Sequence, residues 1–492
     1  MLFLLDNDDY QKLILLDFLE NSEGTISFQE ILDQLNISKY FVKKYINDLH
    51  TDLQQFDIPT TFFSIKADKK NIYYKRLSPL SVVALLKYHY GRRAQLRPFV
   101  DQLFLERSLT QTEFIDQFLM SKPTFSRLRN KLVDYLAKIN LKLSPKLTLT
   151  GDELFIRGFL YKSYFNYQGD HLEALDQPTK TVIFTLIDQI ENIIDIHLSY
   201  AERLKMTHFL AVTLNRIRQA HYLLHNLPYH STEETTPDIA WPTDTVDQVA
   251  KVLLARFNAL NLDLLRFEAK GILNFLYAEL IYTDLDYSNK GAHDLLIDFS
   301  KSLQKFFNIS KDNLRELYLT ERSEQTFIAH FFQVTQYNFP VSNLLKNSHI
   351  PYIDENFAAY MDLARDFITI FAKHFPNRIE YFNAYRENLA VDIFFLLLAH
   401  MNLTKLARPV NITIDFSNGP AYNKFITTEV ENFKALNLRV NSELQSDTDI
   451  YLSDLWPQQT TNTKNIQWTA PPTSLDWENL GNLIIYIKKN RA

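Results

Sequence analysis

Two copies of one sequence pattern lie in the first third of the chain and restrict its fold more than any other feature. The stretch ILDQLNISK begins at Ile31, and the stretch FIDQFLMSK begins at Phe114, 83 positions later. The two stretches match position by position in apolar, acidic, amide, serine and lysine character. The chain is therefore expected to build the same local structure twice.

Each copy predicts a helix, a tight turn and a second helix. In the first copy, Ser27 and Glu30 have the spacing of a capping box at the start of a helix, and Asn36 to Ser38 interrupts that helix. Ser38 is expected to cap a second helix from Lys39 to about Leu53. The apolar stripe of this second helix is predicted to consist of Phe41, Val42, Tyr45, Ile46 and Leu49.

The second copy follows the same plan. Thr110 is expected to cap a helix through Leu119, and Ser121 caps the next helix, whose first turn tolerates Pro123 because the amide hydrogens there are unpaired anyway. A strand pair follows each copy: TFFSIKADKKNIYYKR, with its turn at Asp68 to Asn71, and LKLSPKLTLTGDELFIR. The sequence therefore predicts two winged helix-turn-helix units in tandem, joined by helical residues.

The second helix of each copy leaves basic side chains outside its apolar stripe. A helix fits the major groove of DNA, where Arg and Lys pair with guanine and Thr or Asn reads bases, while wing lysines meet phosphates. A basic surface on one helix is often only a solvated face, but its duplication favours DNA binding. The second unit is more basic and is expected to dominate affinity. The predicted DNA-binding residues are Lys39, Tyr40, Lys43, Lys44, Lys69, Lys70, Lys122, Thr124, Arg127, Arg129 and Lys131.

The charge of the chain is unevenly distributed. The net charge is −6, but residues 1–150 contain 21 Lys and Arg against 17 Asp and Glu, a balance of +4. The remainder contains 31 basic against 41 acidic residues, a balance of −10. A basic end on an acidic body predicts that the first third meets a polyanion, double-stranded DNA, while the rest has another role.

Composition excludes several classes of protein. At 492 residues the chain is expected to form several domains, and 46% hydrophobic residues with only 9 glycines indicate a mainly helical, globular protein. There is no cysteine, which excludes disulfides and thiolate sites. Because long apolar runs and a basic leader are missing, we expect a cytoplasmic protein that does not bind membranes. No enzyme activity, catalytic residue, metal or cofactor is expected.

A second repeat contains histidine. The stretch THFLAVTLNRI includes His208, and AHFFQVTQYNF includes His330, 122 positions later. GILNFLYAEL pairs more weakly with DIFFLLLAHM, which aligns Glu279 with His400. The repeat predicts two helical bundles, residues 160–287 and 288–404. Each histidine is either a packed core residue or a functional one, and phosphoryl acceptance by the imidazole is the functional hypothesis.

After residue 405 the pattern changes to short strands alternating with helices, which predicts a small α/β domain. Helices are expected from about Ala421 to Leu436 and from Leu475 to Lys488. The predicted strands lie in VNITIDF, NLRVN, DIYLSD and NIQWTA. The turn from Ser417 to Pro420 has the character of an anion cradle. Because no Cys or His lies there, a binding or assembly role is predicted rather than catalysis.

This order of parts resembles the Mga/AtxA family of Gram-positive transcription regulators. The resemblance rests on the two helix-turn-helix stretches, THFLAVTLNRI and VDIFFLLLAH. It implies winged helices at 1–77 and 78–159, bundles at 160–287 and 288–404 that resemble phosphotransferase-system regulation domains, and an EIIB-like domain at 405–492. His208, His330 and His400 are the implied phosphorylation sites, with HPr or EII-type proteins as donors. The resemblance also implies a homodimer or higher homo-oligomer.

The sequence departs from this pattern in two places. Glu279 stands where a fourth histidine is expected, and the cysteine that carries phosphate in EIIB transport components is missing. We therefore expect a transcription regulator, an activator of virulence or metabolic genes that works with RNA polymerase and responds to histidine phosphorylation. Alternatives are a nucleoid-type DNA-binding protein without sequence preference and a protein-interaction scaffold. An RNA antiterminator is disfavoured because winged helices suit duplex DNA.

Overall fold

The computed structural model describes residues 4–21, 25–106, 109–168, 176–223, 239–285, 290–307, 323–336, 346–401, 409–432, 438–455, 463–469 and 471–489. Within these ranges the chain is mainly helical with a few small sheets, as predicted. No helix in the same ranges is long and apolar enough to cross a membrane.

The chain divides into two compact parts. One comprises Met1–Phe299, Glu324–Pro351 and Arg365–Asp392, and the other comprises Ser300–Ser323, Tyr352–Ala364 and Ile393–Ala492. The first part contains both predicted helix-turn-helix stretches, and the second contains the C-terminal sheet.

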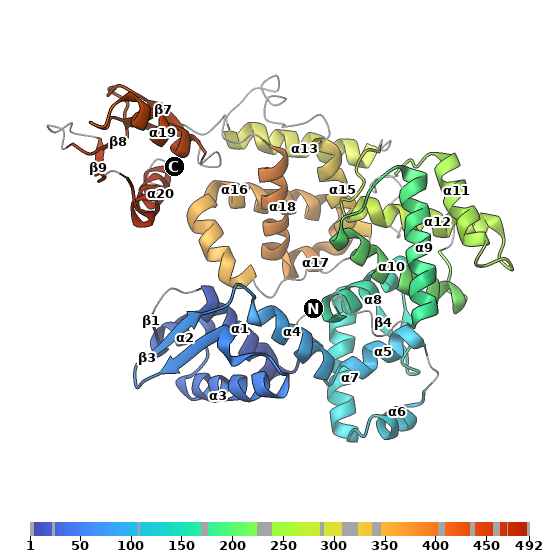
Figure 1. The fold of residues 1–492 in the computed structure, drawn as a ribbon. Helices are drawn as coiled ribbons and strands as arrows, with labels where there is room; N and C mark the ends of the chain where they lie inside the picture. The colour runs from blue at the N-terminus through green and yellow to red at the C-terminus, as the bar shows by residue number, and fades with distance from the viewer. Residues whose placement is uncertain are drawn as a thin grey trace. The chain divides into compact units, whose positions relative to one another are not determined.

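The first helix-turn-helix stretch belongs to a winged helix, here called the first winged helix. Its elements are α1 (Asn7–Asn21), β1 (Thr25–Ser27), α2 (Phe28–Leu35), α3 (Lys39–Gln55), β2 (Phe63–Ala67) and β3 (Asn71–Arg76) (Figure 1). The strands form one antiparallel sheet in the order β1-β3-β2. Ser27 and Glu30 make the predicted capping box at the start of α2. Ser38 takes the predicted N-cap position of α3, without a side-chain capping hydrogen bond.

The second winged helix consists of α4 (Val82–Arg93), α5 (Arg97–Leu105), α6 (Gln111–Gln117), α7 (Lys122–Lys138), β4 (Lys142–Leu143) and β5 (Leu149–Thr150). Its strands pair antiparallel over only two residues each. The prediction that LKLSPKLTLTGDELFIR forms a strand pair throughout is wrong, because α8 begins at Glu153. The Asp152 carboxylate accepts the amide hydrogens of Leu154 and Phe155 and so favours a helix start at this point.

The structural repeat is exact in register. Helices α3 and α7 each begin and end 83 positions apart, and Thr110 makes the same capping box with Glu113 that Ser27 makes with Glu30. The turns before α3 and α7 each contain a left-handed residue, Asn36 at φ 54° and Leu119 at φ 50°. The expected local structure is therefore built twice, although Ser121 caps α7 through its side chain and Ser38 does not cap α3 in this way.

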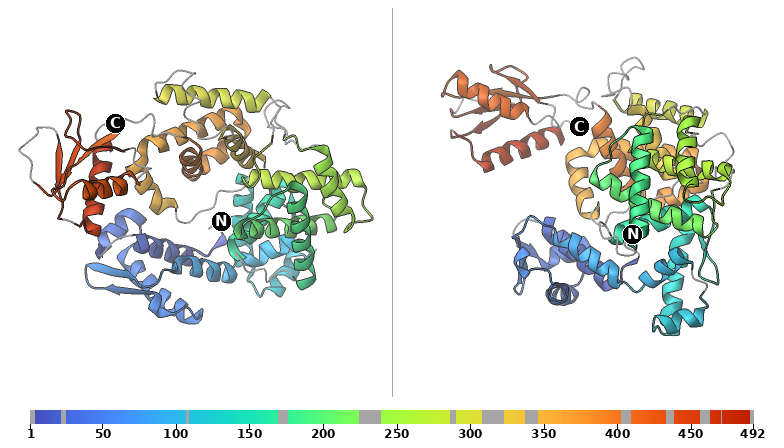
Figure 2. Two further views of the ribbon diagram at one scale, coloured as in Figure 1. Left: turned by 45° about the horizontal axis from the view of Figure 1, so that its top comes forward. Right: turned by 45° about the vertical axis from the view of Figure 1, so that its right-hand side comes forward.

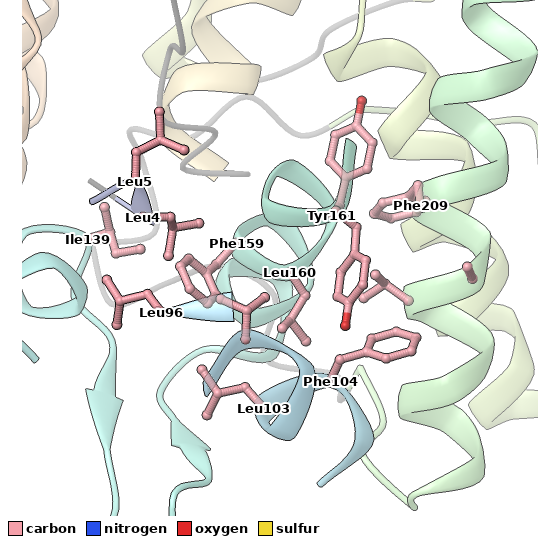
Figure 3. Packing of buried hydrophobic residues seen from close by; sticks show 14 of the residues in the cluster. Leu4, Leu5, Leu96, Leu103, Phe104, Ile139, Phe159, Leu160, Tyr161 and Phe209 are labelled. Atoms are coloured by element: carbon pink, nitrogen blue, oxygen red, sulfur yellow. The ribbon is translucent and has the colours of Figure 1, made fainter. Parts of the chain in front are cut away.

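A helical bundle follows the second winged helix. It contains α8 (Glu153–Gln168), α9 (Gln177–Ile194), α10 (Tyr200–Arg218), α11 (Thr243–Leu254) and α12 (Leu262–Ala278). Phe209 of α10 and Phe275 of α12 stack at 3.9 Å between ring centroids in its centre. The same hydrophobic core continues into both winged helices. Figure 3 shows Leu4 and Leu5 packed near Ile139 and Phe159 at this junction.

The next helices are α13 (Lys290–Phe307), α15 (Ser323–Gln336), α16 (Lys346–His374), α17 (Ile379–Ala384) and α18 (Arg386–His400). Phe299 and Phe367 stack at 4.2 Å, and Phe331 lies 4.8 Å from Phe371 between ring centroids. It stays a prediction that α8–α12 form one regulation domain and that these later helices form a second.

The C-terminal domain has the predicted alternation of strands and helices. Strands β6 (Val410–Ile414), β7 (Leu438–Asn441), β8 (Ile450–Ser453) and β9 (Lys464–Gln467) form a parallel sheet in the order β7-β6-β8-β9. Helices α19 (Pro420–Glu431) and α20 (Ser474–Lys489) both pack against β6, and Figure 2 shows this domain in red. The predicted helix to Leu436 ends at Glu431, and residues 433–436 lie outside the described residues.

Candidate nucleic-acid interface

Helix α3 presents a polar surface opposite its buried stripe. Val42, Tyr45, Ile46 and Leu49 are buried as predicted, but Phe41 is 43% exposed. The assignment of Phe41 to the apolar stripe is therefore wrong. Its ring stacks on the buried Tyr45, at 5.8 Å between centroids, and lies edge-on to the exposed Tyr40 at 5.4 Å.

Two of the predicted lysines on α3 have partners within the first winged helix. Lys39 donates a hydrogen bond to the carbonyl of Lys69 at the wing tip, and its ammonium lies 4.6 Å from the centroid of the Phe28 ring. Lys44 is paired with Asp8 of α1 at 2.5 Å, and this hydrogen bond raises the pKa of Lys44. Lys44 therefore joins α3 to α1, a contact that the prediction of an outward-facing residue missed. Lys43 is exposed.

The tip of the first wing is fixed by a carboxylate. Asp68 accepts the amide hydrogens of Lys70 and Asn71 at 2.6 and 2.7 Å, and the hydroxyl of Tyr73 at 2.9 Å. These hydrogen bonds lower the pKa of Asp68. Lys69 and Lys70 are both exposed at this ordered turn, which suits contact with a phosphate backbone.

Helix α7 carries its predicted residues on two edges. Lys122 and Arg127 are exposed, and Thr124 and Arg129 are partly exposed. Because successive residues of a helix are about 100° apart, Arg127 and Arg129 lie about 200° apart around its axis. Arg127 donates a hydrogen bond to Gln95 Oε1 at 2.9 Å. The cations of α7 therefore flank its outward surface rather than forming one continuous stripe.

Lys131 holds the N-terminal segment. Its ammonium donates a hydrogen bond to the carbonyl of Leu5 at 3.0 Å, and burial lowers the pKa of Lys131. Asp6 lies close enough to oppose that shift electrostatically. Lys131 was predicted to face outward, but it is only partly exposed and its ammonium is bound to the N-terminal segment.

A buried charge cluster joins the first winged helix to α4. Lys12 is paired with Asp9 at 2.8 Å and also with Asp52 of α3. Arg93 of α4 binds Asp52 at 2.7 Å and Asp9 at 2.8 Å, and Tyr90 donates its hydroxyl hydrogen to Asp52 at 2.6 Å. This cluster fixes α3 relative to α1 and α4. Sequence analysis missed it because its members come from three separate helices.

Helix α10 of the bundle is fixed to the end of α5. Asn215 donates its side-chain amide to the carbonyl of Phe104 at 2.6 Å. Arg216 is paired with Glu106, which ends α5, and with Glu153 of α8 at 2.6 Å. Arg216 is therefore buried and paired with two carboxylates from outside α10.

The three predicted phosphorylation sites differ in exposure. His208 on α10 and His330 on α15 are each 3% exposed, whereas His400 at the end of α18 is partly exposed. Burial lowers the pKa of His400. Glu279, aligned with His400 in the repeat, is buried and binds Lys162 at 3.0 Å and Lys205 at 2.8 Å. Although burial disfavours its charge, these two lysines hold the pKa of Glu279 below its usual value.

The predicted anion cradle of the C-terminal domain already has an internal acceptor. The backbone amide of Ser417 donates to Asp454 Oδ1 at 2.8 Å, and the Ser417 hydroxyl donates to the same carboxylate. Both hydrogen bonds lower the pKa of Asp454. An external anion at this turn would have to displace Asp454.

Each recognition helix also has an exposed asparagine midway along its length, Asn47 in α3 and Asn130 in α7. Neither is among the predicted DNA-binding residues, although the helical pattern of the sequence already places both on the outward side of their helices. The signal that identifies them is the repeat itself, because the two asparagines are 83 positions apart.

Residues 81–165 match the family model of the Mga helix-turn-helix domain. A search of curated proteins found no match. The matched range covers the second winged helix and most of α8. The family match supports the suspected relationship to Mga-type regulators and a DNA-binding transcription regulator.

Proposed function

We propose that the chain is a sequence-specific, DNA-binding transcription regulator of the Mga type, and that it activates its target genes in the cytoplasm. The observation that carries this proposal is the recurrence of one helix-turn-helix in exact register, with the second copy inside the matched Mga domain. The proposed role is not catalytic. Double-stranded DNA, RNA polymerase and further copies of the chain are the proposed partners.

The geometry suggests a division of contacts on DNA. Helices α3 and α7 enter the major groove, and Lys122 at the exposed start of α7 meets a phosphate. Lys69 and Lys70 on the first wing meet the backbone beside the groove. Each cation that neutralises a phosphate releases counterions, so the affinity is expected to fall steeply with salt.

Histidine phosphorylation by HPr or EII-type proteins is the proposed control. His400 is the best candidate for a first acceptor because a donor protein can reach a partly exposed imidazole directly. His208 and His330 are buried, so each would become an acceptor only after a local opening of its helix. A phosphoryl group adds about −1.5 to −2 charge, which would alter contacts between subunits.

A titration onto duplex DNA tests the DNA-binding proposal. Wild-type protein is compared at two salt concentrations with the triple variant Lys122→Ala, Arg127→Ala, Arg129→Ala. The matched control removes three exposed lysines outside both winged helices: Lys251→Ala, Lys424→Ala and Lys464→Ala. We expect the first variant to lose most affinity and the control to keep it. Equal binding by all three proteins would contradict the proposed role of α7.

The same titration separates the alternatives. A regulator binds a selected site far more tightly than random DNA, typically by 10³-fold or more. A nucleoid-type protein shows a ratio near one with the same salt dependence. A protein-interaction scaffold shows no salt-sensitive binding to the selected site or to random DNA.

A further inference from the structure

Apart from the exposed lysine that begins each recognition helix, Lys39 and Lys122, the outward surfaces of α3 and α7 have one residue type in common. Helices α3 and α7 have the same length and register, so each position in one has an exact counterpart in the other. The exposed central positions are Tyr40, Lys43, Asn47 and Thr51 in α3, and Pro123, Ser126, Asn130 and Asp134 in α7. Asparagine is the one side chain that both sets have at the same position.

Both asparagines lie where a helix in the major groove meets base edges. With about 100° between successive residues, Asn47 lies across the helix from the buried Leu49 and Tyr45, and Asn130 lies across from Leu132 and Leu128. Among the described residues, neither carboxamide has a hydrogen-bond partner. Folding therefore leaves the donor and the acceptor of both amides available to a ligand.

The chemistry of a carboxamide matches adenine. In the major groove adenine presents the N7 acceptor and an N6 hydrogen, and asparagine can donate to the first while it accepts from the second. We infer that Asn47 and Asn130 each read an adenine, one in each half of the DNA site. This inference rests on the proposed function and assigns the specificity-determining residues within it.

The neighbours of the two asparagines differ, so the half-sites are expected to share the adenine and differ around it. Lys43 and Tyr40 lie beside Asn47, whereas Ser126 and Asp134 lie beside Asn130. The centre of the α7 surface therefore has no cation, because Lys122, Arg127 and Arg129 lie at its edges. The centre of the α7 surface is therefore expected to act by hydrogen bonding to bases rather than by attracting phosphates.

The test begins with selection from a pool of random-sequence duplexes by the full chain. Wild type, Asn47→Ala and Asn130→Ala are selected in parallel, and the enriched sequences are compared. We expect each variant to lose preference for one adenine and to keep the rest of the motif. Asn130→Asp is expected to change that preference toward cytosine, because a carboxylate accepts from the cytosine amino group but cannot donate to N7.

The repeat supplies a matched control. Gln34 in α2 and Gln117 in α6 are also exposed amides at equivalent positions, but the first helix of a helix-turn-helix crosses the backbone and does not read bases. Gln34→Ala and Gln117→Ala are expected to keep both adenine preferences. All four positions are exposed, so the substitutions are not expected to prevent folding.

A chemical change in the DNA then tests the contact itself. Replacing the assigned adenine by 7-deaza-adenine removes the N7 acceptor and should weaken wild-type binding about tenfold. The corresponding Asn→Ala variant should bind both DNAs alike. A selected motif whose adenines survive Asn→Ala would overturn this inference and leave the proposed function in place. Salt-sensitive binding without any enriched motif would overturn both.

Discussion

The two winged helices have equivalent recognition helices, but each winged helix is anchored to the rest of the protein by different contacts. The first has a three-stranded wing with lysines at its tip, and the charge cluster of Asp9, Lys12, Asp52 and Arg93 fixes it to α4. The second has a wing of two-residue strands and is held by Arg216 of the bundle, while the hydrophobic core continues through both winged helices.

This difference indicates where each winged helix can be influenced. A change in the bundle that moves α10 acts directly on the end of α5, because Asn215 and Arg216 contact Phe104 and Glu106. The charge cluster that holds the first winged helix contains no residue of the bundle. We therefore expect signals from the bundle to reach the second recognition helix first.

The largest effect is expected from removing the anchor of the second winged helix. Arg216→Met leaves Glu106 with His221 and Glu153 with Arg157, so neither carboxylate is left entirely unpaired. Breaking a buried ion pair costs about 3–5 kcal/mol. Because both carboxylates keep a partner, we expect Arg216→Met to lower the free energy of unfolding by about 3 kcal/mol, the lower end of this range. Urea denaturation measures it, with exposed Lys251→Met as control. A loss below about 1 kcal/mol would show that Arg216 is not an anchor.

The corresponding change in the first winged helix is expected to be milder. The Arg93 side chain is 30% exposed, and both of its acidic partners keep Lys12. Arg93→Met should therefore lower the free energy of unfolding by about 1 kcal/mol, since solvent screens part of the interaction. Both variants are measured under the same conditions. If Arg93→Met lost as much unfolding free energy as Arg216→Met, or more, the comparison between the two anchors would be reversed.

The two helix-turn-helix turns offer a more sensitive comparison. Asn36 and Leu119 both adopt left-handed backbone conformations, which asparagine tolerates better than leucine. Leu119 is 93% exposed, so its side chain contributes little packing. Leu119→Asn should stabilise the protein by about 1 kcal/mol, and Asn36→Leu should destabilise it by a similar amount. Thermal unfolding measures both changes.

The control at this turn is Leu119→Ala, which removes most of the exposed side chain but keeps the Cβ atom that causes the strain. It should leave stability nearly unchanged. If Leu119→Ala stabilised the protein as much as Leu119→Asn, exposure of the leucine rather than backbone strain would explain the gain.

Local signals in the sequence predicted the recognition helices, whereas contacts between distant segments were missed. Ser27 with Glu30 and Thr110 act on amides within one turn, so spacing alone placed the helix starts. Lys44 and Lys131 were expected to face outward because their helix positions allow it. Their partners, Asp8 and Leu5, lie in the N-terminal segment, whose packing is not encoded near either lysine.

Helix α1 is a second case in which the sequence pattern did not predict the structure. It has no clean apolar stripe, because Asp9, Lys12 and Asp17 are buried together with its leucines. Pattern analysis depends on one polar and one apolar face, so it gave no prediction for this helix. Only the folded chain brings Asp52 and Arg93 to Asp9 and Lys12 and makes their burial favourable.

The smallest predicted effect is a difference between the two wings in how their contribution to stability depends on pH. Asp68, whose carboxylate holds the first wing turn, has a pKa below its ordinary value of 3.8. Its contribution to stability is therefore present above pH 3.8 and is lost as the pH falls through the lowered pKa. The second wing uses the neutral hydroxyl of Ser144, which accepts the amide hydrogens of Lys146 and Thr148 at 3.2 and 3.1 Å.

Two variants measured by thermal unfolding make this comparison. Wild type should melt above Asp68→Asn at pH 6, and the difference should shrink as the pH falls below 3.8 and through the lowered pKa of Asp68, where the carboxylate becomes protonated. The difference between wild type and Ser144→Ala should stay constant over the same range, since a hydroxyl does not titrate there. A constant difference for Asp68→Asn would mean that geometry, rather than the charge of the carboxylate, stabilises the first wing turn.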